Sequence, residues 1–243
     1  PAFFRPYLHK RCISCTISRD LKEEPVVALA IFDLDNTLLA GDSDYLWGQF
    51  LAEHGIVDAE HYERENLRYY QAYQAGTLDI MSFLAFQLQP LAAHDMATLH
   101  GWREQFLREK IDPIILPKAR ALIEHHRRQQ HTLLIITATN SFITGPIAER
   151  MGIENLLASE PELIQGRYTG RVAGVPCFRE GKVTRLDAWL REHKLDLGAS
   201  WFYSDSHNDI PLLERVTYPT AVDPDAQLAA QAQTKGWPVI SLR

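Results

Sequence analysis

The sequence predicts an α/β protein: a Rossmann-like, mostly parallel sheet flanked by helices, with a helical cap subdomain inserted after the first strand. Two observations predict this fold class. From residue 117 onward, short apolar runs alternate with segments of helical periodicity, as in strands joined by helical crossovers. Between residues 43 and 110 the helical periodicity continues without a strand, which is too long for one crossover. We therefore predict a core of residues 25–42 and 111–243 and a cap of residues 43–110.

The composition is typical of a folded globular protein, with 46% hydrophobic and 23% charged residues among 243. A formal net charge of −6 disfavours nucleic acid or an anionic membrane surface as a partner. No apolar run approaches the roughly 20 residues of a membrane-spanning helix. Residues 1–24 have neither a clear period nor a secretory signal, so we expect a flexible extension on a cytoplasmic protein.

The three cysteines do not indicate a disulfide framework. Cys12 and Cys15 form one Cys-x-x-Cys pair, and no second pair completes the four ligands of a structural zinc site. Together with Cys177, they are expected to be reduced thiols.

The first strand is predicted at Val26–Phe32, an unbroken apolar run typical of a strand buried on both faces. Apolar residues at helical spacing then predict four cap helices, the third ending at Pro90 and the fourth covering about Met96–Lys110. Ile111–Pro117 is expected to be the linker back to the core. Several aromatic residues of the cap are expected to form helix core rather than a substrate wall. They are Tyr45, Trp47, Tyr69 and Phe83.

The remaining core elements follow from the same patterns. Pro117 is expected to start a helix, and Ser141 is expected to cap the helix that stops before Gly152. An alternating segment with two glycines predicts a hairpin at Leu163–Val172. The predicted helices are Pro117–Gln129, Ser141–Met151, Gly181–His193, a short one ending at Arg215, and Asp225–Lys235. The other predicted strands are Thr132–Ile136, Leu156–Ser159, Ser200–Ser204, Thr217–Val222 and Pro238–Ile240.

Acidic side chains end two of the predicted strands. Asp33 and Asp35 follow the first strand, and Asp205 follows Ser200–Ser204, with Asp209 one helical turn later. The carboxyl ends of parallel strands share one edge of the sheet, so these carboxylates should converge. At an effective dielectric constant near 20, each like-charge pair about 4 Å apart costs roughly 4 kcal/mol. A bound divalent cation offsets this cost, and oxygen-only ligands indicate Mg²⁺.

A phosphate group also needs hydrogen-bond donors at this edge. Thr137 and Asn140 follow the strand Thr132–Ile136, and Lys182 lies at the start of a predicted helix. We predict that these side chains bind phosphate together with backbone N–H groups of the turn after Asp33.

Four motifs resemble, in order, those of the haloacid dehalogenase-like (HAD) hydrolases. They are Asp33-Leu34-Asp35-Asn36-Thr37, Thr137, Lys182 and Asp205-(three residues)-Asp209. The helical insertion after the first motif resembles the C1 cap of the phosphoserine phosphatase-like branch, subfamily IB. Asp-x-Asp-x-Thr alone is a weak pattern, but the four motifs at matching strand ends agree with one another. The resemblance implies a Mg²⁺-dependent phosphoric monoester hydrolase that acts on a small phosphorylated metabolite.

The resemblance also implies a role for each acid. Asp33 would be the nucleophile that forms an aspartyl phosphate, and Asp35 would be the general acid and then the general base. Asp33, Asp205 and the backbone carbonyl of Asp35 would bind Mg²⁺. Asp209 would lie just behind them and orient water or Lys182.

Further positions carry implied roles in binding. Thr137 and Lys182 would hold the phosphoryl oxygens and neutralise developing charge. Asn208 would orient the last loop. Asp42 falls where this branch commonly has an acid that faces the substrate, and Asp44 follows closely.

The same residues have structural alternatives. Asp209 could be an acid favoured at a helix start, and Thr137 could cap a turn. Lys182 could be a solvated surface lysine. Asp42 could be a loop acid, and Asp44 is favoured as a helix N-cap.

The substrate is suggested by what the cap lacks. Phosphoserine enzymes of this branch carry a cap arginine for the substrate carboxylate, and Ser82–Leu88 offers none, although Arg64 and Arg68 lie earlier. Asp42 and Asp44 would instead suit a cationic head group.

Four stretches resemble a bacterial subgroup whose members include histidinol-phosphate phosphatases. They are Asp42–Tyr45, Thr137–Phe142, Phe178–Lys182 and Tyr203–Ser206. Histidinol phosphate has an ammonium and an imidazole but no carboxylate, so we favour it over phosphoserine and expect a role in amino-acid biosynthesis.

Two other classes remain as alternatives. A dehalogenase needs neither Asp35 nor Mg²⁺, so the second acid and the pair Asp205 and Asp209 argue against it. A phospho-accepting signalling module also combines acids, Thr and Lys on a parallel sheet, but it is near half this length and has no cap.

Overall fold

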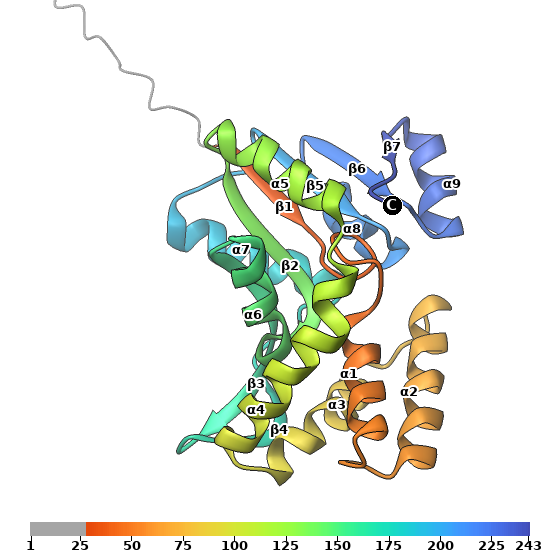
Figure 1. Ribbon diagram of the computed structural model, residues 1–243. Coiled ribbons are helices and arrows are strands. Elements are labelled where there is room, and N and C mark those ends of the chain that lie inside the picture. Colours follow the sequence, from red (N-terminus) through yellow and green to blue (C-terminus); the bar gives the residue numbers. More distant parts are fainter. Residues whose placement is uncertain (1–27) are drawn as a thin grey trace, which may run out of the picture.

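A seven-stranded sheet forms the centre of the structure, and helices cover both of its faces (Figure 1). The computed structural model describes residues 28–243, so the expected extension of residues 1–24, with Cys12 and Cys15, lies outside the described part. The strand order is β4-β3-β2-β1-β5-β6-β7. Neighbouring strands are parallel except β3 and β4, which form an antiparallel hairpin. The predicted fold class is confirmed.

The strands are β1 (Leu29–Phe32), β2 (Thr132–Asn140), β3 (Asn155–Ile164), β4 (Arg167–Ala173), β5 (Ser200–Ser204), β6 (Tyr218–Val222) and β7 (Val239–Ile240). The α-helices are α1 (Ser43–Glu53), α2 (Ala59–Gln74), α3 (Ile80–Ala93), α4 (Met96–Phe106), α5 (Pro117–Arg128), α6 (Ser141–Met151), α7 (Glu180–His193), α8 (Ile210–Leu213) and α9 (Ala226–Lys235).

Strand β1 is the central strand, and its position explains its uniformly apolar sequence. All four of its residues are fully buried, between β2 on one side and β5 on the other. Phe32 is paired in register with Ile135 of β2 and with Tyr203 of β5. The residues that follow these positions are therefore brought to one edge of the sheet.

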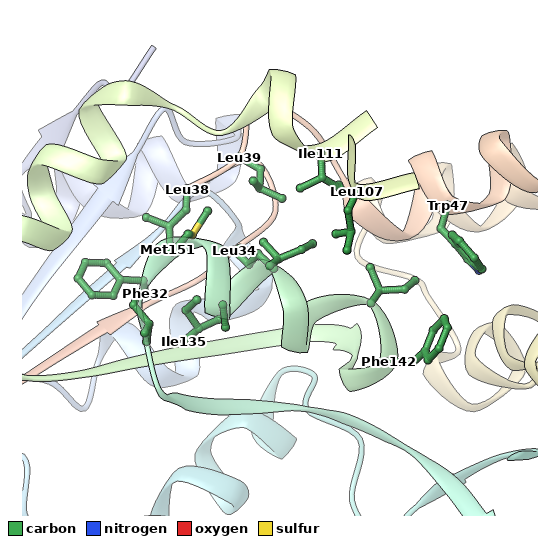
Figure 2. Packing of buried hydrophobic residues seen from close by; sticks show 14 of the residues in the cluster. Phe32, Leu34, Leu38, Leu39, Trp47, Leu107, Ile111, Ile135, Phe142 and Met151 are labelled. Atoms are coloured by element: carbon green, nitrogen blue, oxygen red, sulfur yellow. The ribbon is translucent and has the colours of Figure 1, made fainter. Parts of the chain in front are cut away.

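The two faces of β1 contribute to two separate hydrophobic clusters, as the two-residue period of a strand requires. Leu29 and Ile31 belong to the cluster that packs under α7, α8 and α9. Ala30 and Phe32 belong to the larger cluster on the opposite face, which extends through α5 and α6 into α1 (Figure 2). Trp47 of α1 is fully buried in this larger cluster, so the helical insertion and the sheet share hydrophobic packing.

The hairpin β3–β4 lies against helix α3 of the insertion. Gly170 of β4 has φ 80°, and a side chain there would lie 3.3 Å from the Cβ atom of Ala92. Tyr168 and Val172 pack against the larger cluster, which includes Leu88 and Leu91 of α3. The insertion therefore contacts the core through α3 as well as through α1. The division of the chain into a cap and a core at residues 43 and 110 stays a prediction.

Three predicted boundaries in the insertion and the linker are wrong. Helix α3 does not end at Pro90 but continues to Ala93, because burial of Leu88 and Leu91 outweighs the missing N–H of proline. The fourth helix ends as an α-helix at Phe106. The last part of this predicted helix is a π-helical turn at Leu107–Ile111, and the expected linker contains a 3-10 turn at Asp112–Ile114. The periods of these turns differ from 3.6 residues, but over so few residues the sequence pattern does not separate them from an α-helix or a linker.

Two core strands are longer than predicted. Strand β2 continues to Asn140 rather than ending at Ile136, since β3 runs beside it and pairs Ser159 with Asn140. The predicted strand at Leu156–Ser159 and the first arm of the predicted hairpin form the single strand β3. The hairpin itself is confirmed. No helix within residues 28–243 has the length and apolar character needed to cross a membrane.

A pair of glycine substitutions tests the packing of the insertion. A Cβ atom at Gly48 of α1 would lie 2.6 Å from Nδ2 of Asn66, which donates a hydrogen bond to the carbonyl of Tyr45. We expect Gly48→Ala to lower the free energy of unfolding by about 1–3 kcal/mol through overpacking. Gly101 of α4 is exposed, and a Cβ atom there would meet no neighbouring atom within 4 Å, so Gly101→Ala should raise this free energy by about 0.5–1 kcal/mol. Urea unfolding of both variants measures the two effects, and equal midpoints would contradict the packing described.

Candidate active site

The strand ends bring the first and last acidic motifs together around Thr37. The Thr37 hydroxyl lies 3.2 Å from Oδ2 of Asp33 and 3.1 Å from Oδ1 of Asp205. It also accepts a hydrogen bond of 3.1 Å from the backbone N–H of Asp205. Asp33 and Asp205 are therefore neighbours, although they lie far apart along the chain. The motif alone assigns no role to Thr37, and the structure shows it between the two carboxylates.

Lys182 is buried between two carboxylates rather than lying on the surface. Its Nζ atom is 2.8 Å from Oδ1 of Asp33 and 2.8 Å from Oδ2 of Asp209, and its side chain is 4% exposed. Ser204 at the end of β5 donates a further hydrogen bond of 2.7 Å to Asp209. Burial opposes the charge of Lys182, but Asp209 and Asp33 outweigh it and raise the pKa of this lysine. Asp209 therefore holds Lys182 beside Asp33.

Three hydrogen-bond donors hold the carboxyl group of Asp35. Its Oδ1 accepts a hydrogen bond of 2.7 Å from the backbone N–H of Ser43, at the start of α1. Its Oδ2 accepts one of 2.9 Å from the hydroxyl of Thr139 and one of 3.3 Å from the hydroxyl of Thr137. Burial raises the pKa of Asp35 despite these bonds, which favours the protonated form. Thr139 has no counterpart among the predicted site residues, because only the position of Thr137 matches a motif.

The acids outnumber the cations at this edge of the sheet. Burial raises the pKa of Asp33 to about 7, while Lys182 opposes the shift. Burial and the nearby Asp33 raise the pKa of Asp205 well above its usual range. Such shifts mark carboxylates that need positive charge to stay ionised.

The donor set fits a hard divalent cation. The two carboxylates beside Thr37 supply oxygen ligands, which is the chemistry that Mg²⁺ prefers. Within residues 28–243, no group of three or more His, Cys, Asp or Glu side chains is arranged to hold a metal ion. A cation here would therefore be shared by two carboxylates and further oxygen atoms from the backbone, water or a bound molecule.

A cavity lies above these groups, between the strand ends and the insertion. Its volume is about 50 Å³, which is room for only a few water molecules. Most lining groups from the core are polar, whereas the insertion contributes mostly aromatic and apolar groups together with a few polar ones. The insertion and the residue before it contribute Asp42, Asp44, Tyr45, Asn66, Tyr69, Tyr70, Tyr73, Leu78, Ile80 and Phe83. The core contributes Asp33, Asp35, Thr137, Ala138, Thr139, Phe178, Lys182, Asn208 and Asp209.

Aromatic residues of the insertion are divided between core and cavity. Trp47 is fully buried in the larger cluster, as expected. Tyr69 lies in a small buried cluster against which Phe83 packs, and both residues, with Tyr45, also line the cavity. Tyr69 and Phe83 also contact each other, with ring centroids 5.4 Å apart. One ring can therefore stabilise the insertion and face the cavity at the same time.

Asp42, rather than Asp44, caps helix α1. The Asp42 side chain accepts a hydrogen bond of 2.8 Å from the backbone N–H of Tyr45. Asp44 lies in the first turn of the helix and is 4% exposed, and its Oδ1 accepts a bond of 3.3 Å from the side-chain amide of Asn140. The prediction that Asp44 is the N-cap is therefore wrong. Both acids line the cavity, and burial raises the pKa of Asp42 to about 7.

Asn140 is occupied elsewhere and does not line the cavity. Its Oδ1 accepts a hydrogen bond of 3.3 Å from the backbone N–H of Ile143, so it is the N-cap of α6. Ser141, the expected cap of this helix, is instead its first residue and donates to Glu160. The structure thus gives Asn140 partners other than a phosphate, and the role predicted for it is not supported. The sequence pattern alone does not decide which of the two adjacent residues caps the helix, because Asn and Ser are both preferred at the N-cap position.

Asn208 and Arg179 connect the core to the turn after α2. Arg179 donates from Nε to Oδ1 of Asn208 at 2.9 Å and from Nη2 to the carbonyl of Gly76. Asn208 donates to the carbonyl of Tyr73 at 3.4 Å. Arg179 has φ 49°, an uncommon conformation for a non-glycine residue, which costs about 1–3 kcal/mol and needs support from its surroundings. The sequence does not identify Arg179 as a residue that connects the core to the insertion, because neither its residue type nor its neighbours predict its unusual backbone conformation.

The two arginines suggested as carboxylate ligands do not reach the cavity. Arg64 contacts His61 and Glu65, and Arg68 contacts Glu65, and both side chains are more than half exposed. Among the described residues that line the cavity, Lys182 is the single cation.

Comparisons with known proteins agree with this geometry. Residues 30–214 match the profile of the haloacid dehalogenase-like hydrolases. The chain is 45% identical over 219 residues to the histidinol-phosphatase of Neisseria meningitidis serogroup C (strain 8013). The aligned region covers 88% of this chain and 99% of that protein. A crystal structure of a protein with unknown function from Bordetella pertussis Tohama I has a TM-score of 0.85 at 44% identity, covering 90% of this chain and 100% of that one. The structure of a phospho-aspartyl intermediate analogue of phosphoserine phosphatase has a TM-score of 0.66 at 15% identity, and the alignment covers 90% of this chain and 94% of that one. This similarity is one of fold.

Removing the charge of Lys182 tests the buried ion cluster. We expect Lys182→Met to lower the free energy of unfolding by about 3–5 kcal/mol, because Asp33 and Asp209 would be left buried without a cation. Lys235→Met is the matched control, since Lys235 forms an exposed pair with Glu214 and should change stability by less than about 1 kcal/mol. Urea unfolding measures both. A Lys182→Met protein as stable as the control variant would show that the cluster does not depend on this lysine.

Proposed function

Because the chain belongs to the haloacid dehalogenase-like hydrolase family and is a phosphatase of that family, we propose that it hydrolyses L-histidinol phosphate through an aspartyl phosphate on Asp33. The observation that supports this substrate is the charge of the cavity. Asp44 is buried in its wall and Asp42 is half-buried there. Among the described lining residues Lys182 is the one cation, and it is already paired with Asp33 and Asp209.

Asp33 is the proposed nucleophile. Its carboxylate oxygen attacks phosphorus, the bond from phosphorus to the ester oxygen breaks, and the alcohol oxygen takes a proton from Asp35. Asp35 then accepts a proton from a water molecule that attacks the aspartyl phosphate and releases inorganic phosphate. The raised pKa of Asp35 favours the protonated form that the first step requires. Its three hydrogen bonds, from Ser43, Thr137 and Thr139, fix the orientation of the carboxyl group.

Asp33, Asp205 and the backbone carbonyl of Asp35 are the proposed ligands of Mg²⁺. The bound ion supplies positive charge that keeps the carboxylates ionised and offsets the charge of the phosphoryl group. Thr37 holds the two carboxylates at a common distance from its hydroxyl. Asp209 does not bind the ion but positions Lys182.

Thr137 and Lys182 are the proposed phosphate-binding residues, and both line the cavity beside Asp33. Asn208, which contacts the turn after α2, is proposed to position the last loop rather than to bind phosphate. Asn140 is left out of the phosphate site because its side chain caps α6.

The charge of the cavity favours histidinol phosphate over phosphoserine. Histidinol phosphate would bring an ammonium and an imidazole to Asp42 and Asp44. The carboxylate of phosphoserine would be placed near the same two acids, and neither Arg64 nor Arg68 lines the cavity. The histidinol-phosphatase of Neisseria meningitidis supports the same choice. A phospho-accepting signalling module, the alternative of another class, has no use for an acid placed like Asp35 to promote hydrolysis.

The substrate proposal is tested by comparing two phosphate esters. We expect kcat/KM for L-histidinol phosphate to exceed that for L-phosphoserine by at least about tenfold, equivalent to roughly 1.4 kcal/mol in the transition state. Phosphate release with Mg²⁺ measures both rates, and excess EDTA should stop both reactions. A preference for phosphoserine would overturn the choice of substrate, and activity in EDTA would overturn the proposed ion.

Variants of the two acids of the first motif test the proposed chemistry. Asp33→Asn should abolish turnover because the amide is not a nucleophile for phosphorus. Asp35→Asn should lower kcat by about 100- to 10,000-fold, the range expected for loss of a general acid. Asp187→Asn, which changes an exposed acid paired with Arg215, should retain wild-type activity. Turnover of Asp33→Asn at the wild-type rate would remove this residue from the nucleophile role.

A further inference from the structure

We propose that Asp44 is a specificity-determining residue that accepts a hydrogen bond from the imidazole ring of the substrate, while Asp42 faces the ammonium group. This inference rests on the proposed function and assigns separate tasks to the two acids. It depends on where the two carboxylates lie and on which structural bonds they already make.

Asp44 has no structural task that requires a carboxylate. Asp42 caps helix α1, so the first-turn N–H groups do not need Asp44. The hydrogen-bond partner of Asp44 is neutral: the side-chain amide of Asn140, at 3.3 Å. No Lys, Arg or His within residues 28–243 forms an ion pair with it. A carboxylate that is 4% exposed and lacks a cation is costly, and a ligand that donates to it would offset the cost.

The two acids are buried to different extents. Asp42 precedes helix α1 and is half-buried. Asp44 lies in the first turn of the helix, is 4% exposed and contacts Asn140 at the end of β2. Asp44 is therefore the more deeply buried of the two acids in the wall of the cavity.

In histidinol phosphate the two nitrogen-containing groups lie at different distances from the phosphate. Its ammonium group is two carbons from the ester oxygen, and its ring is one carbon further away. With the phosphate at Asp33, the ammonium would reach the level of Asp42 first and the ring would extend towards Asp44. An imidazole carries an N–H donor in both its neutral and its charged form, so Asp44 can accept from either.

Flat apolar surfaces surround the deeper part of the cavity. Tyr69 and Phe178 belong to one small buried cluster with Leu78, against which Phe83 packs, and all four line the cavity. Aromatic faces of this kind favour a planar ring over an aliphatic chain. Asn66 also lines the cavity and is held in place, because it donates to the carbonyl of Tyr45 and accepts from Gln87. The cavity of about 50 Å³ would have to widen to admit the ring, so these contacts describe its closed form.

The test compares two substrates that differ only in the ring. L-Histidinol phosphate and (2S)-2-aminopropyl phosphate share the phosphate and the ammonium, but the second has no imidazole. Asp44→Asn should lower kcat/KM for histidinol phosphate by about 10- to 100-fold, as expected for loss of a charge-assisted hydrogen bond. It should change kcat/KM for 2-aminopropyl phosphate by less than about threefold. Asp42→Asn should lower both, and Glu63→Gln, on the exposed face of α2, should change neither.

Stability measurements separate a specificity role from a structural one. Because Asp44→Asn removes a buried carboxylate without a cation, its urea midpoint should equal or exceed that of the wild type. Asp44→Ser, which keeps a hydroxyl for Asn140, should show the same selective loss and covers the case in which the amide variant does not fold.

The outcomes distinguish this inference from the proposed function. If both Asp44 variants slow the two substrates equally, or if both unfold at lower urea concentration, Asp44 is structural and the inference is wrong while the proposed function stands. If the wild type does not prefer histidinol phosphate to 2-aminopropyl phosphate, the proposed substrate itself is wrong.

Discussion

The site depends on one buried cation, Lys182, held between Asp33 and Asp209. The register of β1 between β2 and β5 brings these acids to one edge of the sheet, where each alone would be costly to bury. The lysine offsets two of the carboxylates and leaves Asp205 beside Thr37 for a further cation. The fold and the chemistry are therefore linked, because the same parallel register that buries the central strand also concentrates the negative charge.

Sequence patterns are sufficient to predict the sheet and the acids that follow its strands. Buried parallel strands are continuous apolar runs, and polar residues directly after them stand out, so Asp33, Asp35 and Asp205 can be identified directly. Asp209 can be placed beside Asp205 because it follows one helical turn later, and Lys182 can be placed near them because it lies at the start of a predicted helix. Much of the candidate site is thus determined by short segments whose local structure is unambiguous.

The wrong predictions arise where two residues with similar preference for the helix N-cap lie close together, or where the backbone geometry is irregular. Asp42 and Asp44 are both good helix caps, and only the path of the chain decides which one caps α1. Asn140 and Ser141 present the same ambiguity at α6. Arg179 acts from a left-handed backbone conformation, and α3 passes through Pro90 because of its tertiary contacts. These features come from long-range packing, which a local pattern does not record.

The attachment of α3 to the hairpin β3–β4 restricts how the cavity can be reached. Helix α3 is fixed through Gly170 and Ala92, and α1 is fixed through Trp47, so neither can swing away without breaking hydrophobic packing (Figures 1 and 2). Helix α2 buries only Tyr62, Asn66 and Tyr69, and its C-terminal turn is held to the core by the polar contacts of Arg179 and Asn208. Displacement of α2 would therefore break these hydrogen bonds and the packing of Tyr69 against Phe178, while leaving the packing of α3 against the hairpin intact.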